Sequence, residues 1–234
     1  MIRLGNFLFR YRNAVFPVMF VLLFVNSPRI FPSSALAVSL GIVVALLGQA
    51  LRVVTIGLAY IKRGGKQYHV YADTLVQEGM FNHCRNPLYV GNFVIVVGLA
   101  LVANSLLFAV VGLPFFLIAY RAIVAAEENY LSQKFGEAYA AYCRRVNRFV
   151  PDFSGFGATW RGMDFDWRRV VIKEYGSTFP WVAAVILLLL KHEWLRSALS
   201  QPTSSILVAL LVLTGILYAV ARYLKKSRIL RASS

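Results

Sequence analysis

The polar run HCRNPLYVGN, residues 83–92, opens one of the most apolar stretches of the chain. A proline suits the first turn of a helix, so we expect a helix to begin at Pro87. The free N–H groups and partial positive charge of a helix start can hold a carboxylate or a phosphate. Arg85 can contact a carboxylate with two N–H groups, and the ring of Tyr89 can stack on a flat heterocycle. Gly91 lets another group approach the backbone closely. The same residues are also typical of an ordinary membrane anchor.

A second cluster of ionisable residues, Arg121, Glu127 and Glu128, stands at the end of another apolar stretch. Arg121 and Glu128 are seven residues apart, which is two helical turns, so they share a helix face. Ionisable residues near the end of a membrane span indicate either a functional site or a structural ion pair. Both interpretations stay open from these residues alone.

Together the two clusters resemble a signature of membrane methyltransferases, Arg-His-Pro-x-Tyr-x-Gly followed by an apolar span and Glu-Glu. Here RNPLYVG and the two acids stand at either end of such a span. The similarity continues through EENYLSQKFGEAYAAYCRRVNRFVP after the span and LVQEGMF before it. The signature belongs to the isoprenylcysteine carboxyl methyltransferase family and the related phospholipid N-methyltransferases. The resemblance covers residues 75–151, which form a methyltransferase-like core.

The resemblance implies a site for S-adenosylmethionine where the two clusters meet at the cytoplasmic face of a membrane. The residues that would bind this cofactor are Arg85, Asn86, Pro87, Leu88, Tyr89, Gly91, Glu127 and Glu128. Glu128 would accept a hydrogen bond from the ammonium group or ribose, and Arg121 would face the carboxylate of the substrate. These two are the expected catalytic residues. The implied acceptor is lipophilic, either an isoprenylcysteine-like carboxylate or a lipid.

Two features depart from the family pattern. Asn86 stands where relatives have histidine, and an amide can form hydrogen bonds but cannot take up a proton near neutral pH. His83 is close enough in sequence to substitute, although an interfacial histidine is more often structural. The apolar pair of segments over residues 179–224 is also additional to the core.

The elements that must position these clusters are membrane helices, because the chain is 59% hydrophobic and only 15% charged. Apolar runs of about 20 residues recur, the length that crosses a hydrocarbon core of about 30 Å. We therefore expect an all-α, polytopic transmembrane bundle that forms a single domain over residues 1–234. The expected six spans cover residues 14–25, 35–61, 87–102, 106–126, 179–190 and 204–224, with a kink at Pro114.

Basic residues lie between the apolar runs and predict the orientation of the bundle. With both termini in the cytoplasm and Arg222 counted with the C-terminal tail, 20 of the 25 basic residues fall in inner segments and 3 in outer loops. The net charge of +15 is therefore best explained by contact with anionic headgroups and not by nucleic acid. The two cysteines, Cys84 and Cys143, show no metal-binding spacing and are expected to be free thiols. No bound metal is expected, and the sequence does not indicate an oligomeric state.

Two other functions compete with methyl transfer. Membrane sterol and enone reductases carry a similar Arg-x-Pro-x-Tyr turn near a nicotinamide cofactor, but the Glu127–Glu128 pair favours the methyltransferase. A non-catalytic membrane scaffold is the third possibility, and the asparagine at position 86 is the feature that supports it.

Overall fold

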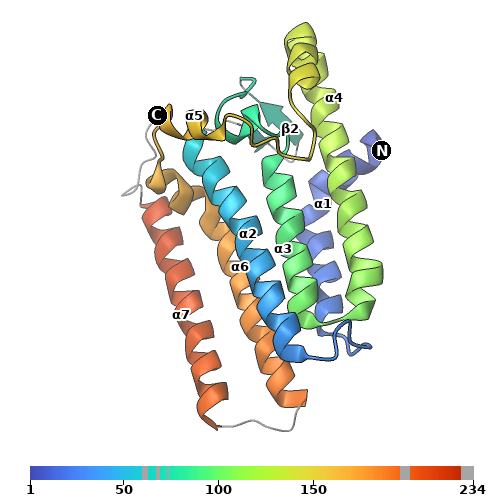
Figure 1. Cartoon of the computed structure of the whole chain (residues 1–234), viewed down its shortest axis with the longest axis vertical. Coiled ribbons are helices and arrows are strands. Elements are labelled where there is room, and N and C mark those ends of the chain that lie inside the picture. The colour runs from blue at the N-terminus through green and yellow to red at the C-terminus, as the bar shows by residue number, and fades with distance from the viewer. Residues whose placement is uncertain (60–62, 67–68, 73, 196–200, 228–234) are drawn as a thin grey trace.

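The apolar stretches of the sequence form long helices in the computed structural model (Figure 1). The structure describes residues 1–59, 63–66, 69–72, 74–195 and 201–227, excluding the side chains of the 63–66 and 69–72 segments and of Gln201. The long helices are α1 (Ile2–Phe20), α2 (Ser34–Leu58), α3 (Pro87–Ala103), α4 (Leu113–Arg145), α6 (Trp167–Leu195) and α7 (Gln201–Lys226). The short elements are η1 (Val21–Phe24), β1 (Arg63–Lys66), β2 (His69–Ala72), η2 (Gly79–Asn82), η3 (Phe108–Gly112) and α5 (Phe156–Arg161).

Within the described residues, five helices are long and apolar enough to cross a membrane, and α3 is a shorter apolar helix. The 17 residues of α3 span about 26 Å at a rise of about 1.5 Å per residue, close to a full hydrocarbon core. The prediction of a helical transmembrane bundle with about six spans is confirmed. Strands β1 and β2 form a small antiparallel hairpin in the connector that precedes α3, where the sequence indicated only a polar link.

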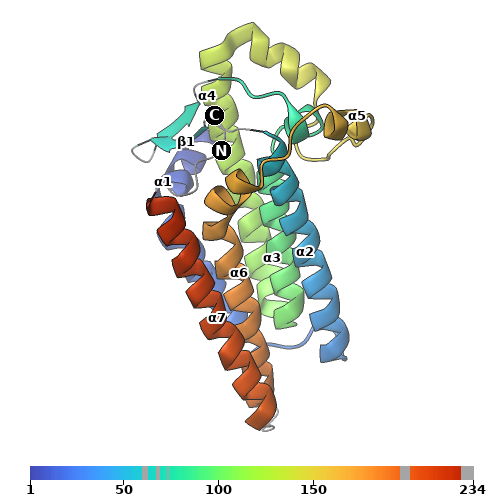
Figure 2. The same ribbon diagram turned by 90° about the vertical axis from the view of Figure 1, so that its left-hand side faces the viewer.

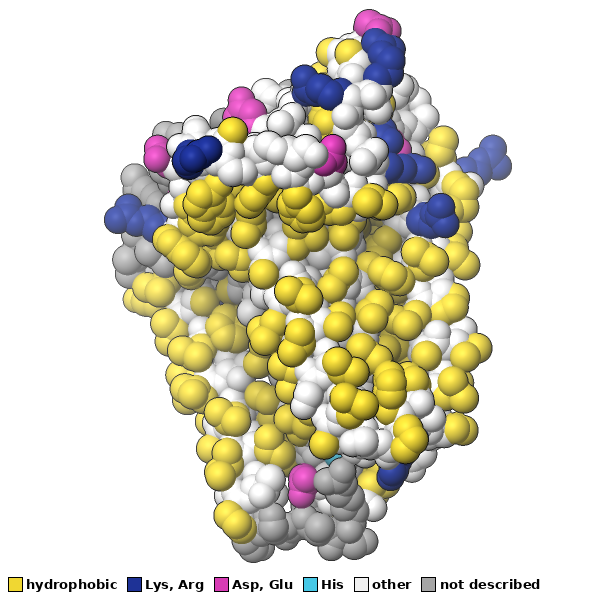
Figure 3. Space-filling model, viewed as in Figure 1, with side chains coloured by type: hydrophobic (Ala, Val, Ile, Leu, Met, Phe, Trp, Pro, Cys, Tyr) yellow, Lys and Arg dark blue, Asp and Glu magenta, His cyan; other side chains and the backbone are white. Residues whose placement is uncertain are grey.

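The two ends of the bundle differ in charge. The start of α1 and the last turn of α7 lie at the same end as the start of α3 (Figures 1 and 2). Most of the visible lysine and arginine side chains gather there, above a broad hydrophobic band (Figure 3). We call this end, which holds Met1, Asn86 and Lys226, the basic end. Its position in the cytoplasm stays a prediction from the charge pattern.

Small residues bring α2 and α3 into close contact. A Cβ atom added to Gly98 would lie 2.6 Å from the carbonyl oxygen of Gly41, and one added to Gly48 would lie 2.7 Å from that of Gly91. No side chain fits in these gaps, so the two backbones touch directly, as is common between membrane helices. This packing holds α3 against the first and middle turns of α2.

Several helices extend beyond their predicted limits. Helix α1 begins at Ile2, α4 continues through the two acids to Arg145, and α6 begins at Trp167 instead of residue 179. Each extension mixes charged with apolar residues, so hydropathy alone does not detect it. The chain in α4 bends at Gly136, which has a φ of 51°. The π-helical turn η3 ends two residues before Pro114, which lies in the first turn of α4. The kink expected at Pro114 stays a prediction. Residue 61, the expected end of the second span, lies outside the described residues.

Candidate functional site

The two predicted clusters meet at the basic end, one at the start of α3 and the other on α4. Asn86 is the residue that precedes α3, and its side-chain amide donates to Oε1 of Glu128 at 3.3 Å and to the carbonyl of Arg148 at 3.1 Å. The hydroxyl of Tyr89, one turn further on, donates to Oε1 of Glu127 at 2.6 Å. Residues 38 and 42 positions apart in sequence are thus in direct contact.

Glu128 is held by two arginines. Its Oε2 atom lies 2.7 Å from Nη2 of Arg148, and its Oε1 atom lies 3.5 Å from Nη1 of Arg85. The Glu128 side chain is only 16% exposed, so this contact is partly shielded from solvent. The Nε atoms of Arg85 and Arg148 are buried and have no hydrogen-bond partner. Buried donors of this kind are uncommon, so these two atoms are candidates for contact with a bound ligand.

The segment that follows α4 is hydrogen-bonded to residues 83–88, which we call the polar turn. The N–H of Arg85 donates to the carbonyl of Asn147 at 2.8 Å, and the N–H of Asp152 donates to the carbonyl of His83 at 2.9 Å. Both ring nitrogens of His83 are also occupied, one by the carbonyl of Asp152 and the other by the hydroxyl of Thr159. His83 is 3% exposed. These contacts give it a structural position beneath the turn.

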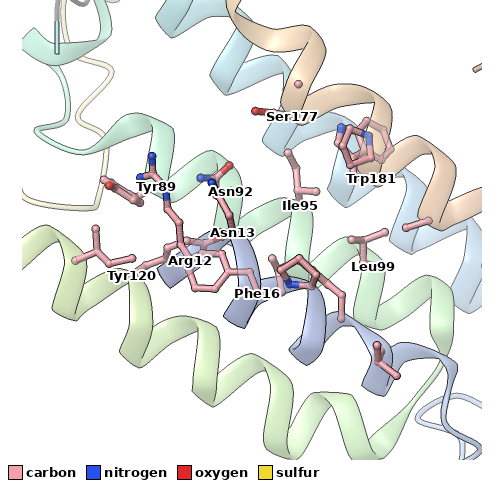
Figure 4. Close-up of a pocket in the computed structure, with 18 of the residues that line it drawn as sticks. Arg12, Asn13, Phe16, Tyr89, Asn92, Ile95, Leu99, Tyr120, Ser177 and Trp181 are labelled. Carbon is pink, nitrogen blue, oxygen red and sulfur yellow. The ribbon is translucent and has the colours of Figure 1, made fainter. Parts of the chain in front are cut away.

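A cavity of about 750 Å³ lies among α1, α3, α4 and α6 (Figure 4). Its volume is typical of small-molecule sites, which range from about 300 to 1,000 Å³. Most of its wall is apolar and comes from side chains such as Phe16, Phe20 and Leu99. The polar groups on the wall are Arg12, Asn13, Tyr89, Asn92, Tyr120, Ser177 and Trp181. An apolar cavity with a few polar groups suits an amphipathic ligand.

Tyr89 connects the cavity to the polar turn. Its ring lines the cavity and lies 5.7 Å from the ring of Tyr120, while its hydroxyl bonds Glu127. Tyr89 is therefore the residue that the cavity and the contact with Glu127 share.

The other predicted residues lie in different positions. Pro87 is buried at the first turn of α3, and Leu88 is half-buried. Gly91 faces α2, because a Cβ atom there would lie 2.6 Å from Cγ of Arg52 and 2.8 Å from the carbonyl oxygen of Gly48. The group that approaches Gly91 closely is thus a neighbouring helix.

Arg121 does not occupy the position that the sequence suggested. Its side chain is exposed, it does not line the cavity, and within the described residues Glu128 pairs with Arg85 and Arg148 instead. Helical periodicity places Arg121 and Glu128 on one face, but the arginines that contact Glu128 come from outside α4. The cation that lines the cavity is Arg12 of α1, which the sequence analysis did not single out.

Several functional candidates were missed because their signal is not local. Asn92 is the last residue of the polar run and could have been read as part of it. Arg148 belongs to the basic stretch after α4, where it looks like an orientation signal. Ser177 and Trp181 stand on a helix whose start was misplaced, and nothing in their spacing indicates a cavity.

Comparisons with known proteins agree with the arrangement of these clusters. The family model described as phospholipid methyltransferase matches residues 36–138. The cobalt-zinc-cadmium resistance protein CzcN of Cupriavidus metallidurans is 32% identical over 162 residues, which cover 67% of this chain and 72% of that protein. The nickel-cobalt-cadmium resistance protein NccN of Alcaligenes xylosoxydans xylosoxydans is 39% identical over 82 residues, or 35% of this chain and 38% of its own length.

A third relative is an enzyme by name. The protein-S-isoprenylcysteine O-methyltransferase of Schizosaccharomyces pombe is 31% identical over 115 residues, 45% of either chain. No solved structure matches the chain. Although two relatives are named for metal resistance, the part of the chain that the structure describes holds no group of three or more His, Cys, Asp or Glu residues that could bind a metal ion. By the matched region and these relatives, the chain belongs to the family of integral membrane proteins related to isoprenylcysteine carboxyl and phospholipid methyltransferases.

Proposed function

We propose that this protein transfers a methyl group from S-adenosylmethionine to a lipophilic acceptor at the cytoplasmic face of the membrane. The observation that carries the proposal is the contact between the two family clusters beside a cavity, made by Asn86 with Glu128 and by Tyr89 with Glu127. The family membership supports methyl transfer in general. The cofactor, the acceptor and the side of the membrane are parts of the proposal.

The residues of the polar turn fit the cofactor chemically. The buried Nε atoms of Arg85 and Arg148 lack acceptors, and the carboxylate of an amino acid could supply them. Glu127 and Glu128 are acceptors for an ammonium group or for ribose hydroxyls. When bound, S-adenosylmethionine supplies an activated methyl group together with its own leaving group. The protein then has to orient the reactants and exclude water.

The cavity fits the acceptor. Its apolar wall matches a hydrocarbon chain, and Arg12 places a positive charge on that wall. The guanidinium of Arg12 lies 4.4 Å from the centre of the Phe9 ring, and no described carboxylate forms an ion pair with it. A cation on a membrane helix that has no acidic partner among the described residues is a candidate for binding an anionic group. We therefore assign to Arg12 the role that the sequence suggested for Arg121, which is to face the carboxylate of the substrate.

Binding of S-adenosylhomocysteine, the product of the cofactor, tests the proposal directly. Purified protein in detergent is titrated by calorimetry, and we expect a dissociation constant in the micromolar range. The variant Glu128→Gln removes the negative charge between Arg85 and Arg148 and should weaken binding about tenfold or more, because contacts to charged groups are worth about 1.5–3 kcal/mol. Glu137→Gln is a matched control, since Glu137 is 81% exposed on the same helix.

The same titration separates methyl transfer from the competing functions. A folded protein that binds NADPH and not S-adenosylhomocysteine would support a reductase. A folded protein that binds neither ligand at high micromolar concentration would remove the proposal and leave the non-catalytic scaffold.

A further inference from the structure

A buried ion pair joins α2 to α6 next to the cavity. The side chains of Arg52 and Glu174 are 8% and 4% exposed. Nη2 of Arg52 donates to Oε1 of Glu174 at 2.7 Å, and Nε of Arg52 donates to Oε2 at 2.9 Å. Gln49, one turn before Arg52, also donates to Oε2 at 3.2 Å. The carboxylate is therefore satisfied from three donors on α2.

The same residues reach the wall of the cavity on α6. Arg52 donates through Nη2 to the hydroxyl of Ser177 at 3.0 Å. The indole N–H of Trp181 donates to Oε1 of Gln49 at 2.8 Å. Ser177 and Trp181 both line the cavity. The position of this wall is thus set by polar contacts with α2.

Arg52 also contacts the start of α3. Its Nη1 atom donates to Oδ1 of Asn92, which lines the cavity, and to the carbonyl of Leu88 at 3.4 Å. The side chain of Arg52 reaches α3 by passing over Gly91, where a Cβ atom would lie 2.6 Å from its Cγ atom. One guanidinium therefore contacts both the polar turn and the opposite wall of the cavity.

Stability alone does not explain a buried pair of this kind. Removing two charges from water is so costly that well-packed apolar residues often hold two helices together equally well or better. An apolar pair would not, however, fix the angular position of α6 or contact Leu88 and Asn92. The ion pair is therefore better suited to setting geometry than to adding stability.

We infer that Arg52 and Glu174 are positioning residues that align the acceptor cavity with the cofactor-binding turn. This inference rests on the proposed function, because it gives the two sites their identity. It also assigns a role to α6, which lies outside the region matched by the family model: α6 forms one wall of the acceptor site. Neither residue touches the reacting atoms, so their effect would pass through Asn92, Ser177 and Trp181.

The double variant Arg52→Met/Glu174→Met tests the inference, because it removes the polar contacts but keeps the packed volume. The protein is placed in liposomes of native lipid extract with S-adenosylmethionine that carries a labelled methyl group, and label in the organic phase is measured. We expect the rate at saturating cofactor to fall about tenfold or more, because a shift of about 1 Å can slow a reaction a hundredfold. The dissociation constant of S-adenosylhomocysteine and the KM for S-adenosylmethionine should change less than threefold.

Two further variants keep the test decisive. Arg52→Lys retains the buried charge but has one ammonium group, which cannot reach Glu174, Ser177 and Asn92 together, so its rate should also fall. Arg144→Met/Glu137→Met removes an ion pair with side chains 66% and 81% exposed and should leave the rate unchanged. Folding of each variant is checked by gel filtration and circular dichroism. A folded double variant that keeps the rate within threefold would overturn the inference.

A second measurement does not depend on enzymatic activity. In a background where Trp160, Trp167 and Trp194 are phenylalanine, Trp181 is the single fluorophore of this type. The double variant should shift its emission, because Gln49 and Trp181 lose their fixed arrangement. Unchanged emission would contradict the positioning role. If the wild-type protein binds no S-adenosylhomocysteine and transfers no methyl group, the proposed function fails. The emission of Trp181 then decides by itself whether Arg52 and Glu174 position the α6 wall of the cavity.

Discussion

Replacing Gly91 with alanine should destabilise the bundle through α2. The backbone of Gly91 is helical, so alanine is not strained there by its dihedral angles. The new methyl group would instead lie 2.6 Å from Cγ of Arg52 and 2.8 Å from the carbonyl oxygen of Gly48. The arginine side chain is held at its far end by Glu174, and the carbonyl belongs to a rigid helix. Neither neighbour can move without breaking other contacts.

The expected loss follows from these distances. Overpacking of a well-filled site typically costs about 1–3 kcal/mol. Alanine is favoured over glycine in a helix by up to about 1 kcal/mol, which offsets part of that cost. We therefore expect Gly91→Ala to lower the free energy of unfolding by up to about 2 kcal/mol, which is the largest overpacking cost less the helix gain.

Denaturation by sodium dodecyl sulfate in mixed micelles, followed by far-UV circular dichroism, measures this change. Gly215→Ala is the matched control, because Gly215 lies inside α7 and its added Cβ atom would have no neighbour within 4 Å. That variant should be neutral or slightly more stable. If both variants unfold at the same detergent fraction, the close approach of α2 to Gly91 is wrong and so is the path given for Arg52.

Three other predictions follow from single contacts. Burial raises the pKa of the Cys84 thiol to about 11, so at pH 8 its thiolate is scarce and iodoacetamide should label it slowly. The labelling rate is measured by mass spectrometry, and equal rates in folded and unfolded protein would contradict this burial. Tyr89→Phe removes a hydrogen bond to a carboxylate and should lower stability by about 1.5–3 kcal/mol, measured by the same denaturation, whereas no change would mean that the bond is not formed. Arg12→Gln should raise several-fold the concentration of an anionic lipid acceptor that gives a half-maximal rate. Arg10→Gln, the control at an exposed residue of the same helix, should not change it, and equal effects would show that only the general positive charge matters.

The sequence predicts the bundle well because membrane spans have a strong local signal. A run of apolar residues must become a helix in a bilayer, since each backbone N–H and C=O needs a partner within its own segment. The limits of α4 and α6 were missed because these helices continue into amphipathic turns. Those turns carry Glu174, whose buried contact with Arg52 no hydropathy pattern reveals.

The site was predicted in part, and the reason differs from residue to residue. The meeting of Asn86 with Glu128 follows from two clusters that stand at the same end of neighbouring helices. The roles of Arg12 and Arg148 depend on which elements pack side by side, and a single sequence does not contain that information. Gly91 was noticed for the right property, close approach, but its neighbour is α2.

Under the proposed function, the asparagine at position 86 supplies no base to deprotonate an acceptor. Its amide already donates to Glu128 and to the carbonyl of Arg148, and an amide cannot remove a proton from an acceptor near neutral pH. A carboxylate needs no base, because it carries a lone pair throughout the neutral range. An alkylammonium group has a pKa of about 10.4, so it must first lose a proton.

The pH dependence of the rate distinguishes the two acceptor classes. For a carboxylate acceptor, the rate at saturating S-adenosylmethionine should be nearly constant between pH 6 and 8. For an amine acceptor without a base, the rate should rise about tenfold for each pH unit, in proportion to the neutral amine. Liposomes equilibrated at each pH on both sides, with labelled cofactor, provide the measurement. Because Arg12 adds a positive charge to the cavity and Asn86 provides no base, we expect the flat profile, and a rise of about tenfold per pH unit would refute an acidic acceptor.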